Sequence, residues 1–421
     1  MNSNEVIVSI SLGGEDISVG RLWFHVRKGR ESASFEYDNN WLKHPEKFAL
    51  EPALKLTEGA FHTQTGLSVF GSIGDSAPDR WGRVLIRRNE TANARSRKTT
   101  PRTLFEIDYL LGVNDEARQG ALRFSFDTNE DEREFLTPNT QASIPPLVDL
   151  PKLLSAAERF IENDDSAEDL RLLLAPGSSL GGARPKASVR DHDGSLAIAK
   201  FPRKDDDYNV VKWEAVALTL AHKGGLNVPS WHLETILGKP VLIIKRFDRQ
   251  NGQRIPFLSA MSMLGARDNE QHSYLEMAYA LAQNGAAPKE DMAELWRRIV
   301  FTIMISNTDD HLRNHGFVYE RFKGWRLSPV YDVNPTPIDA KPRILSTAID
   351  FDNTSASLQT ALEVAKDFRL SKIETHEIVK EVTGAVLQWR TVASDFGLTK
   401  QESDRMASAF EHDDLRDAER L

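Results

Sequence analysis

Apolar and polar residues alternate near the start of the chain in the way that the strands of a half-buried sheet require. The alternation covers EVIVSISL (5–12), RLWFHVR (21–27) and SASFEYD (32–38), with the turn KGRE between the last two. A helical period then follows Pro78, with apolar residues at Trp81, Val84 and Leu85. The pattern predicts a small antiparallel sheet followed by a helix.

Residues 127–147 lose this periodicity and collect acids and prolines, which is typical of a linker. We therefore expect a β-rich N-terminal subdomain over 1–126 and a second domain over 148–421. The second domain reads as two helices, a glycine-bearing loop, a hairpin, a helix, two more strands and a mostly helical half. This order predicts an α+β, two-lobed protein-kinase-like fold. Its ATP-binding part would span about 171–255, and its helical catalytic lobe about 256–421.

The composition of the chain excludes several kinds of chemistry. The 421 residues include no cysteine, which excludes a disulfide, a cysteine-ligated zinc and a thiol nucleophile. The net charge of -9 argues against a general nucleic-acid binder. The N-terminus lacks an export signal, and no segment has the ~20 apolar residues of a membrane span, so we expect a cytoplasmic protein.

One stretch, 79–102, opposes the acidic balance with seven arginines and a lysine against Asp79 and Glu90. Such a run is usually the solvated face of a surface helix. The alternative is a contact with a polyanion or an acidic partner.

Two residues predict an internal ion pair. Glu214 lies in the middle of the apolar face of the helix NVVKWEAVALTLAHKGG, where a carboxylate is costly without a cation. Lys200 ends the apolar strand SLAIAKF and is the best candidate. A strand lysine paired with a helix glutamate holds ATP phosphates in kinases. The alternative is two independent, partly exposed side chains.

The loop SSLGGARPKA, 178–187, has features of a phosphate-binding loop. Gly181 and Gly182 let the backbone approach an anion, and Lys186 can neutralise it. The loop matches neither common phosphate-binding motif, so a plain flexible turn is the alternative.

The stretch FTIMISNTDDHLRNHGF, 301–317, carries the strongest catalytic signal. A kinase catalytic loop needs an aspartate that accepts the substrate's proton and, five residues later, an asparagine that holds Mg²⁺. Asp309 and Asn314 have this spacing, and Asp332 follows the next hairpin where a second magnesium ligand belongs. The alternative is that Asp309 caps a loop and Asn314 lies in a turn. His311 reads as a loop-packing histidine rather than a metal ligand.

Taken together, the segments SSLGGARPKA, AIAKFP, WEAVALTLAHKGGLNVPSW, KRFDR, NTDDHLRNHGF and LSPVYDV resemble the HipA toxins of bacterial type II toxin-antitoxin systems. GDSAPDRWGRVLIRR and DYLLGVNDEARQGALRF resemble that family's N-terminal subdomain, so the resemblance covers roughly residues 5–390. The chain departs from many relatives at Arg184, Pro185 and Asp310.

The resemblance implies a Ser/Thr protein kinase that uses ATP and Mg²⁺. Asp309 would be the catalytic base, and Asn314 and Asp332 would hold the metal. Ser179 is the expected autophosphorylation site, with Ser178 as a second candidate. The expected nucleotide-binding residues are Ser179, Gly181, Gly182, Ala183, Lys186, Lys200, Glu214, His311, Asn314 and Asp332. We read Phe247, Asp248 and Arg249 as structural.

The family's substrates include aminoacyl-tRNA synthetases, so the implied outcome is growth arrest, and the implied partner is a helix-turn-helix antitoxin that binds DNA. Two alternatives stay open: a small-molecule kinase on the same fold, and an inactive pseudokinase that acts as a DNA-bound corepressor. We expect Asp310 beside the site, where its replacement by glycine would be tolerated.

Overall fold

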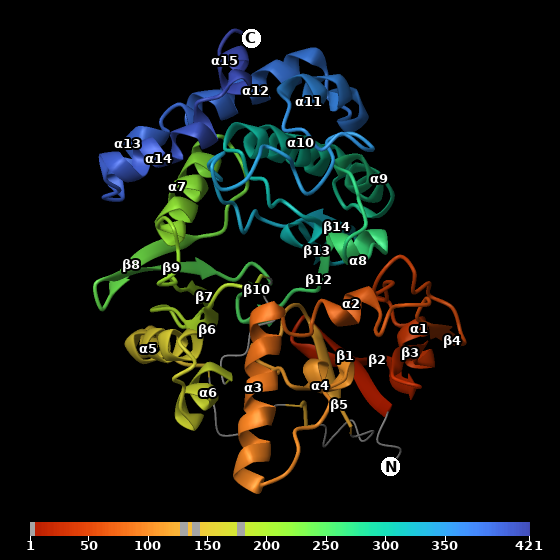
Figure 1. Ribbon diagram of the computed structural model, residues 1–421. Helices are drawn as coiled ribbons and strands as arrows, with labels where there is room; N and C mark the ends of the chain where they lie inside the picture. The colour runs from red at the N-terminus through yellow and green to blue at the C-terminus, as the bar shows by residue number, and fades with distance from the viewer. Residues whose placement is uncertain (1–4, 127–133, 137–143, 175–181) are drawn as a thin grey trace. The chain divides into compact units, whose positions relative to one another are not determined.

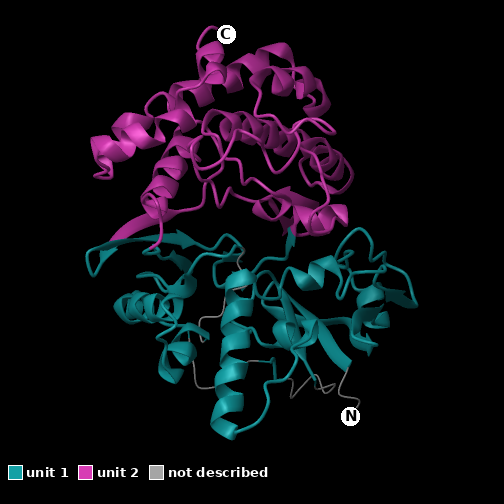
Figure 2. Ribbon diagram, in the orientation of Figure 1, with its two compact units in different colours: residues 1–204, 235–258 teal, residues 205–234, 259–421 magenta. Residues whose placement is uncertain are grey.

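The computed structural model describes residues 5–126, 134–136, 144–174 and 182–421. The chain forms two compact units: unit 1 holds residues 1–204 and 235–258, and unit 2 holds 205–234 and 259–421 (Figure 2). The subdomain boundary expected at 127–147 stays a prediction, since most of that segment lies outside the described residues.

Unit 1 begins with a five-stranded antiparallel sheet in the order β4-β3-β2-β1-β5 (Figure 1). The turn between β2 and β3 places Lys28 and Gly29 at φ 52° and 75°, the conformation that tight hairpins need. The three strands predicted from the alternation are confirmed. The strands are β1 (Glu5–Leu12), β2 (Glu15–Arg27), β3 (Arg30–Tyr37), β4 (Ala60–His62) and β5 (Leu122–Ser125).

A second sheet of unit 1 is built from antiparallel strands in the order β6-β7-β9, and β8 follows beside β9. These strands are β6 (Lys186–Arg190), β7 (Leu196–Lys200), β8 (Trp231–Ile236) and β9 (Lys239–Lys245), followed by the short β10 (Arg249–Gln250), β11 (Gln253–Arg254) and β12 (Phe257–Ser259). The helices are α1 (Asn39–Lys43), α2 (Gly71–Gly74), α3 (Arg80–Arg97), α4 (Glu106–Leu111), α5 (Leu150–Ile161) and α6 (Ala167–Leu174).

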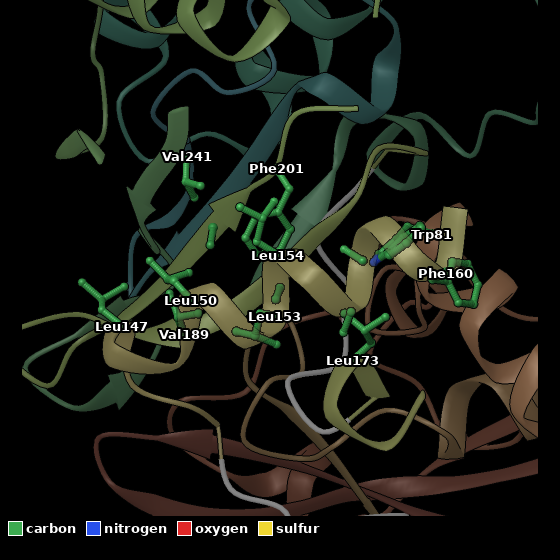
Figure 3. Packing of buried hydrophobic residues seen from close by; sticks show 14 of the residues in the cluster. Trp81, Leu147, Leu150, Leu153, Leu154, Phe160, Leu173, Val189, Phe201 and Val241 are labelled. Atoms are coloured by element: carbon green, nitrogen blue, oxygen red, sulfur yellow. The ribbon is translucent and has the colours of Figure 1, made fainter. Parts of the chain in front are cut away.

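One hydrophobic cluster joins α3, α5 and α6 to the β6-β7-β9 sheet (Figure 3). Trp81 and Leu85 of α3 belong to it, together with Phe160 of α5. The sheet contributes alternate residues of one face, such as Ala187 and Val189, as the period of a strand requires. The helix expected in the N-terminal subdomain therefore packs directly on the sheet that was expected to bind ATP.

Unit 2 is mostly helical, as the second half of the sequence predicts. It contains one β-hairpin, β13 (Gly316–Glu320) with β14 (Gly324–Leu327), placed between α10 and α11 along the chain. Its helices are α7 (Val210–Lys223), α8 (Ala260–Leu264), α9 (Tyr274–Asn284), α10 (Pro288–Met304), α11 (Leu358–Val364), α12 (Lys372–Val386), α13 (Trp389–Asp395), α14 (Lys400–Phe410) and α15 (Asp413–Ala418).

A buried charge network in unit 1 centres on Asp248. Its carboxylate accepts hydrogen bonds from Arg246 Nη2 at 2.6 Å, Arg249 Nη1 at 2.9 Å and the Gly120 amide at 2.7 Å. Both arginines also donate to the backbone carbonyl of Arg118. Burial would raise the pKa of Asp248, but Arg246 and Arg249 outweigh it and hold the pKa well below its usual range. These contacts tie residues 117–120 to the strand after β9, which gives Asp248 and Arg249 the structural role assigned from the sequence.

Replacing Asp248 by asparagine should therefore destabilise unit 1 strongly. Two buried arginines would lose their counter-charge, which costs about 3–5 kcal/mol and corresponds to a fall in melting temperature of about 10 °C. Asp193→Asn is the control, because Asp193 pairs with Lys245 at the surface and should change little. In the wild type, the contribution of Asp248 is present above its unfolded pKa of ~3.9 and is lost as the pH falls below it. Equal melting temperatures for the two variants would contradict the structural role.

Candidate active site

The chain that follows α10 brings two neighbouring carboxylates into opposite environments. Asp310 is buried, with 4% of its surface exposed, whereas the side chain of Asp309 is 74% exposed. The intervening backbone is fixed by the Ser346 hydroxyl, which donates to the carbonyl of Thr308, and by the Thr347 hydroxyl, which donates to that of Asp310. From the sequence alone, the two acids are adjacent residues of one loop, and their different burial is not visible.

Three side chains hold the buried carboxylate. Asp310 Oδ2 accepts from the Tyr274 hydroxyl at 2.5 Å and the Thr302 hydroxyl at 3.3 Å, and lies 3.0 Å from His315 Nε2. Burial would raise the pKa of Asp310, but the neighbouring His315 prevails and lowers it. Burial, reinforced by Asp310, raises the pKa of Tyr274 well above its usual value. The expectation that Asp310 lies beside the reacting groups is wrong: its carboxylate is a buried anchor for α9, α10 and the loop.

Asp309 presents its carboxylate to solvent while its backbone is held. Asn314 Nδ2 donates to the Asp309 carbonyl at 3.0 Å, and the His311 amide donates to the same carbonyl at 2.9 Å. The nearest cation among the described residues of unit 2 is Lys341, with Nζ 3.7 Å from Asp309 Oδ1. Sequence reasoning missed Lys341, since it lies in an irregular segment with no spacing that relates it to Asp309.

A side-chain contact links the segments that carry the two expected metal ligands. The Tyr331 hydroxyl, next to Asp332 in sequence, donates to the carbonyl of Arg313, next to Asn314, at 2.9 Å. Asp332 has a φ of 55°, an uncommon conformation for a residue other than glycine. Asn314 uses its amide nitrogen within the loop. An amide oxygen and a carboxylate are ligand types that suit Mg²⁺, and the assignment of Asn314 and Asp332 as its ligands stays a prediction.

In unit 1, two of the predicted lysines are direct cross-strand partners. Lys186 of β6 pairs with Lys200 of β7 in the antiparallel register, so both side chains leave the same face of the sheet. Lys186 is buried and its Nζ lies 3.0 Å from Asp79 Oδ2, with 3% exposure of both side chains. Lys200 is half-buried. The like charges therefore differ in environment, and Lys186 is already neutralised by the protein.

The start of α3 also fixes the end of the glycine loop. Asp79 caps α3 by accepting from the Gly82 amide at 2.8 Å, and the Trp81 indole donates to the Lys186 carbonyl at 3.0 Å. The Trp81 amide donates to the carbonyl of Gly182, whose φ of 91° favours glycine. Sequence reasoning missed Asp79 and Trp81, although a buried-type tryptophan beside an acid in PDRW was a visible signal.

The remaining predicted residues fall into four groups. Glu214 is buried in α7, as its position in the helical pattern requires, but it belongs to unit 2 and Lys200 to unit 1, so their pairing stays a prediction. His311 begins the short turn before β13 and its carbonyl accepts from the Asn314 amide, so it supports the loop. Gly182 and Ala183 are exposed. Ser178, Ser179 and Gly181 lie outside the described residues.

Comparison with known proteins defines the class. Across 98% of this chain and 97% of the other, the fold matches HipA of Shewanella oneidensis, solved with HipB and its operator DNA, with a TM-score of 0.64 and 17% identity. The fold is therefore HipA-like and of the two-lobed kinase type, as predicted. The model of the HipA-like C-terminal domain matches residues 178–390, and the chain belongs to this family.

The curated relatives match only part of this chain. A Haemophilus influenzae protein named as a candidate kinase is 29% identical over 190 residues, which is 38% of this chain and 54% of the relative. A Sinorhizobium fredii candidate kinase is 25% identical over 184 residues, 38% of this chain and 42% of the relative. The matches thus span about half the length of the curated relatives. Within the described residues, the helices are too short or too polar to cross a membrane.

The environments of the two acids predict opposite results for stability. Asp310→Gly should not be tolerated, because it leaves Tyr274 and His315 with unpaired polar groups in the interior. The cost is about 3 kcal/mol, or about 6–12 °C in the melting temperature of unit 2. Asp309→Asn is the matched control and should leave the melting temperature unchanged. A stable Asp310→Gly protein would restore the interpretation drawn from the sequence.

Proposed function

We propose that this protein is a HipA-type Ser/Thr protein kinase that transfers the γ-phosphoryl group of ATP to a protein hydroxyl. The observation that carries the proposal is the exposed carboxylate of Asp309 on a loop whose backbone is fixed by Asn314 and by the buried Asp310. A kinase catalytic loop needs this combination of an accessible base and a rigid support.

In the proposed mechanism, the substrate hydroxyl oxygen forms a bond to the γ-phosphorus while the bond between that phosphorus and the β,γ-bridging oxygen breaks. Asp309 orients the hydroxyl and accepts its proton. ADP leaves with the bridging oxygen. Lys341 Nζ lies 3.7 Å from Asp309 Oδ1 and is a candidate for contact with the transferred group.

The bound Mg²⁺ would offset the negative charge of the phosphates, and Asn314 and Asp332 are the residues that would hold it. Lys200 would contact the α- and β-phosphates, supported by Glu214. Lys186 is paired with Asp79, so it would support the glycine loop rather than contact phosphate. Gly182 and Ala183 would line the nucleotide, with Ser179 and Gly181 in the segment before them.

The proposed biological role is that of a toxin. Phosphorylation of a translation factor, such as an aminoacyl-tRNA synthetase, would arrest growth, and a helix-turn-helix antitoxin bound to DNA would neutralise the kinase. The support is the family and the shared fold with HipA, which was solved with HipB and operator DNA. Autophosphorylation of Ser179, or of Ser178 beside it, would add about two negative charges to the loop and inhibit ATP binding.

Asp309→Asn should abolish phosphoryl transfer. Loss of a general base lowers the rate by about 10²–10⁴-fold, while the fold stays intact because the side chain is exposed. Transfer of radiolabel from γ-labelled ATP to proteins of a bacterial lysate measures it. Asp395→Asn, an exposed residue of α13, is the control and should keep full activity.

The same assay separates the alternatives. Label on small molecules with none on protein would favour a small-molecule kinase. No label, weak MgATP binding and equal toxicity of the wild type and Asp309→Asn would favour a pseudokinase that acts as a corepressor.

A further inference from the structure

The structure divides the cations of the basic stretch into two kinds. Three arginines are used internally. Arg83 pairs with Glu106, Arg88 donates to the Phe160 carbonyl at 3.0 Å and lies 3.2 Å from Asp165, and Arg102 lies near Glu90 and Asp108. These residues attach α3 to its neighbours α4 and α5, so they are not available to a ligand.

The other cations form a stripe, which we define as Arg80, Arg87, Arg95 and Lys98. All four are exposed, and no carboxylate among the described residues pairs with them. At 100° per residue the three arginines fall within an arc of about 80°, whose middle points about 120° away from the buried Leu85, and Lys98 follows as the residue that ends the helix. Thr91 lies within the same arc. Arg97, exposed and likewise without a carboxylate partner in the described part of the chain, points about 120° away from the middle of the arc.

A hollow of about 450 Å³ runs along this stripe. Arg87, Arg88, Thr91 and Arg95 line one wall, and Asn163 and Asp165 belong to the other. Figure 1 shows α6 beside α3. Asp165 is the only carboxylate among the described residues that lines it and is already paired with Arg88, so these residues give the hollow a surplus of positive charge.

We propose that the stripe binds the phosphodiester backbone of duplex DNA. The stripe extends over about 27 Å, and Arg87 and Arg95 are about 12 Å apart along the helix. That separation matches the ~12 Å width of the major groove, so the two arginines can contact phosphates on both of its sides. Arginine presents a fork of donors that suits phosphate oxygens.

A folded protein partner fits this surface less well. Protein interfaces depend on buried aromatic or large apolar anchors, and α3 exposes no large hydrophobic side chain. Regular cations without apolar anchors are the pattern expected for backbone contacts that position a protein on DNA without reading its sequence. The inference deepens the proposed assembly with a DNA-bound antitoxin, but it concerns the chain itself and does not depend on phosphoryl transfer.

The test titrates the full chain into a fluorescently labelled DNA duplex at several salt concentrations and follows anisotropy. Arg87→Ala/Arg95→Ala should weaken binding at low salt by at least about tenfold. It should also reduce the slope of log K against log salt by about 2, one for each lost phosphate contact. Alanine is the best helix former, so α3 should stay intact, which circular dichroism checks.

Two controls isolate the stripe. Arg27→Ala/Arg30→Ala removes the same charge from the exposed β2–β3 hairpin of unit 1, and Arg97→Ala removes one from the other side of α3. Both should retain the wild-type slope. Phosphoryl transfer should be unchanged in all of these variants, so a failed kinase assay would leave this test intact.

Several results would overturn the inference. One is an equal loss of affinity in the hairpin control, which would indicate net charge alone. Another is wild-type protein that does not bind the duplex at low salt. Displacement of DNA by polyglutamate with the same dependence on Arg87 and Arg95 would indicate an acidic protein partner instead. Displacement by pyrophosphate at equal phosphate concentration would indicate a site for a small phosphate ligand.

Discussion

The buried carboxylate of Asp310 is the constraint on which the candidate catalytic loop depends. An unpaired charge in the interior would be costly, so the carboxylate needs Tyr274 from α9, Thr302 from α10 and His315 at the start of β13. Those contacts set the position and direction of the backbone between α10 and β13. With Asp310 fixed inside, the neighbouring side chain of Asp309 remains 74% exposed.

The same arrangement occurs in unit 1 with the opposite charge. Lys186 and Lys200 leave one face of the sheet side by side, and Asp79 neutralises the buried one. In each case one of two like charges is buried with a partner from the protein, and the second is more exposed. Asp79 and Trp81 also make the start of α3 part of the support for the glycine loop. The N-terminal segment therefore contributes to the candidate nucleotide site as well as to its own sheet.

Periodicity was enough to predict the strands of the first sheet, because their alternation reflects local burial. It also placed Glu214 inside, since a helix pattern shows which face is buried. The fates of Asp309 and Asp310 could not be predicted in this way. Tyr274 lies 36 residues before Asp310, and only the tertiary fold brings the two together, while His315 lies five residues after Asp310 in the same stretch without a pattern that pairs them. For the same reason the sequence could not show that Lys186 pairs with Asp79, the residue that caps α3.

The net negative charge of the whole chain makes the local positive charge of the stripe on α3 important for any contact with a polyanion. With a net charge of -9, the protein as a whole is repelled by polyanions, so attraction has to come from a local surplus of cations. A local surplus of positive charge requires that neighbouring carboxylates are absent or already paired. Asp165, the carboxylate among the described residues that lines the hollow, is paired with Arg88. Repulsion from the rest of the surface would then disfavour other orientations. We therefore expect the stripe to affect the orientation of the protein on a polyanion more than the affinity of binding.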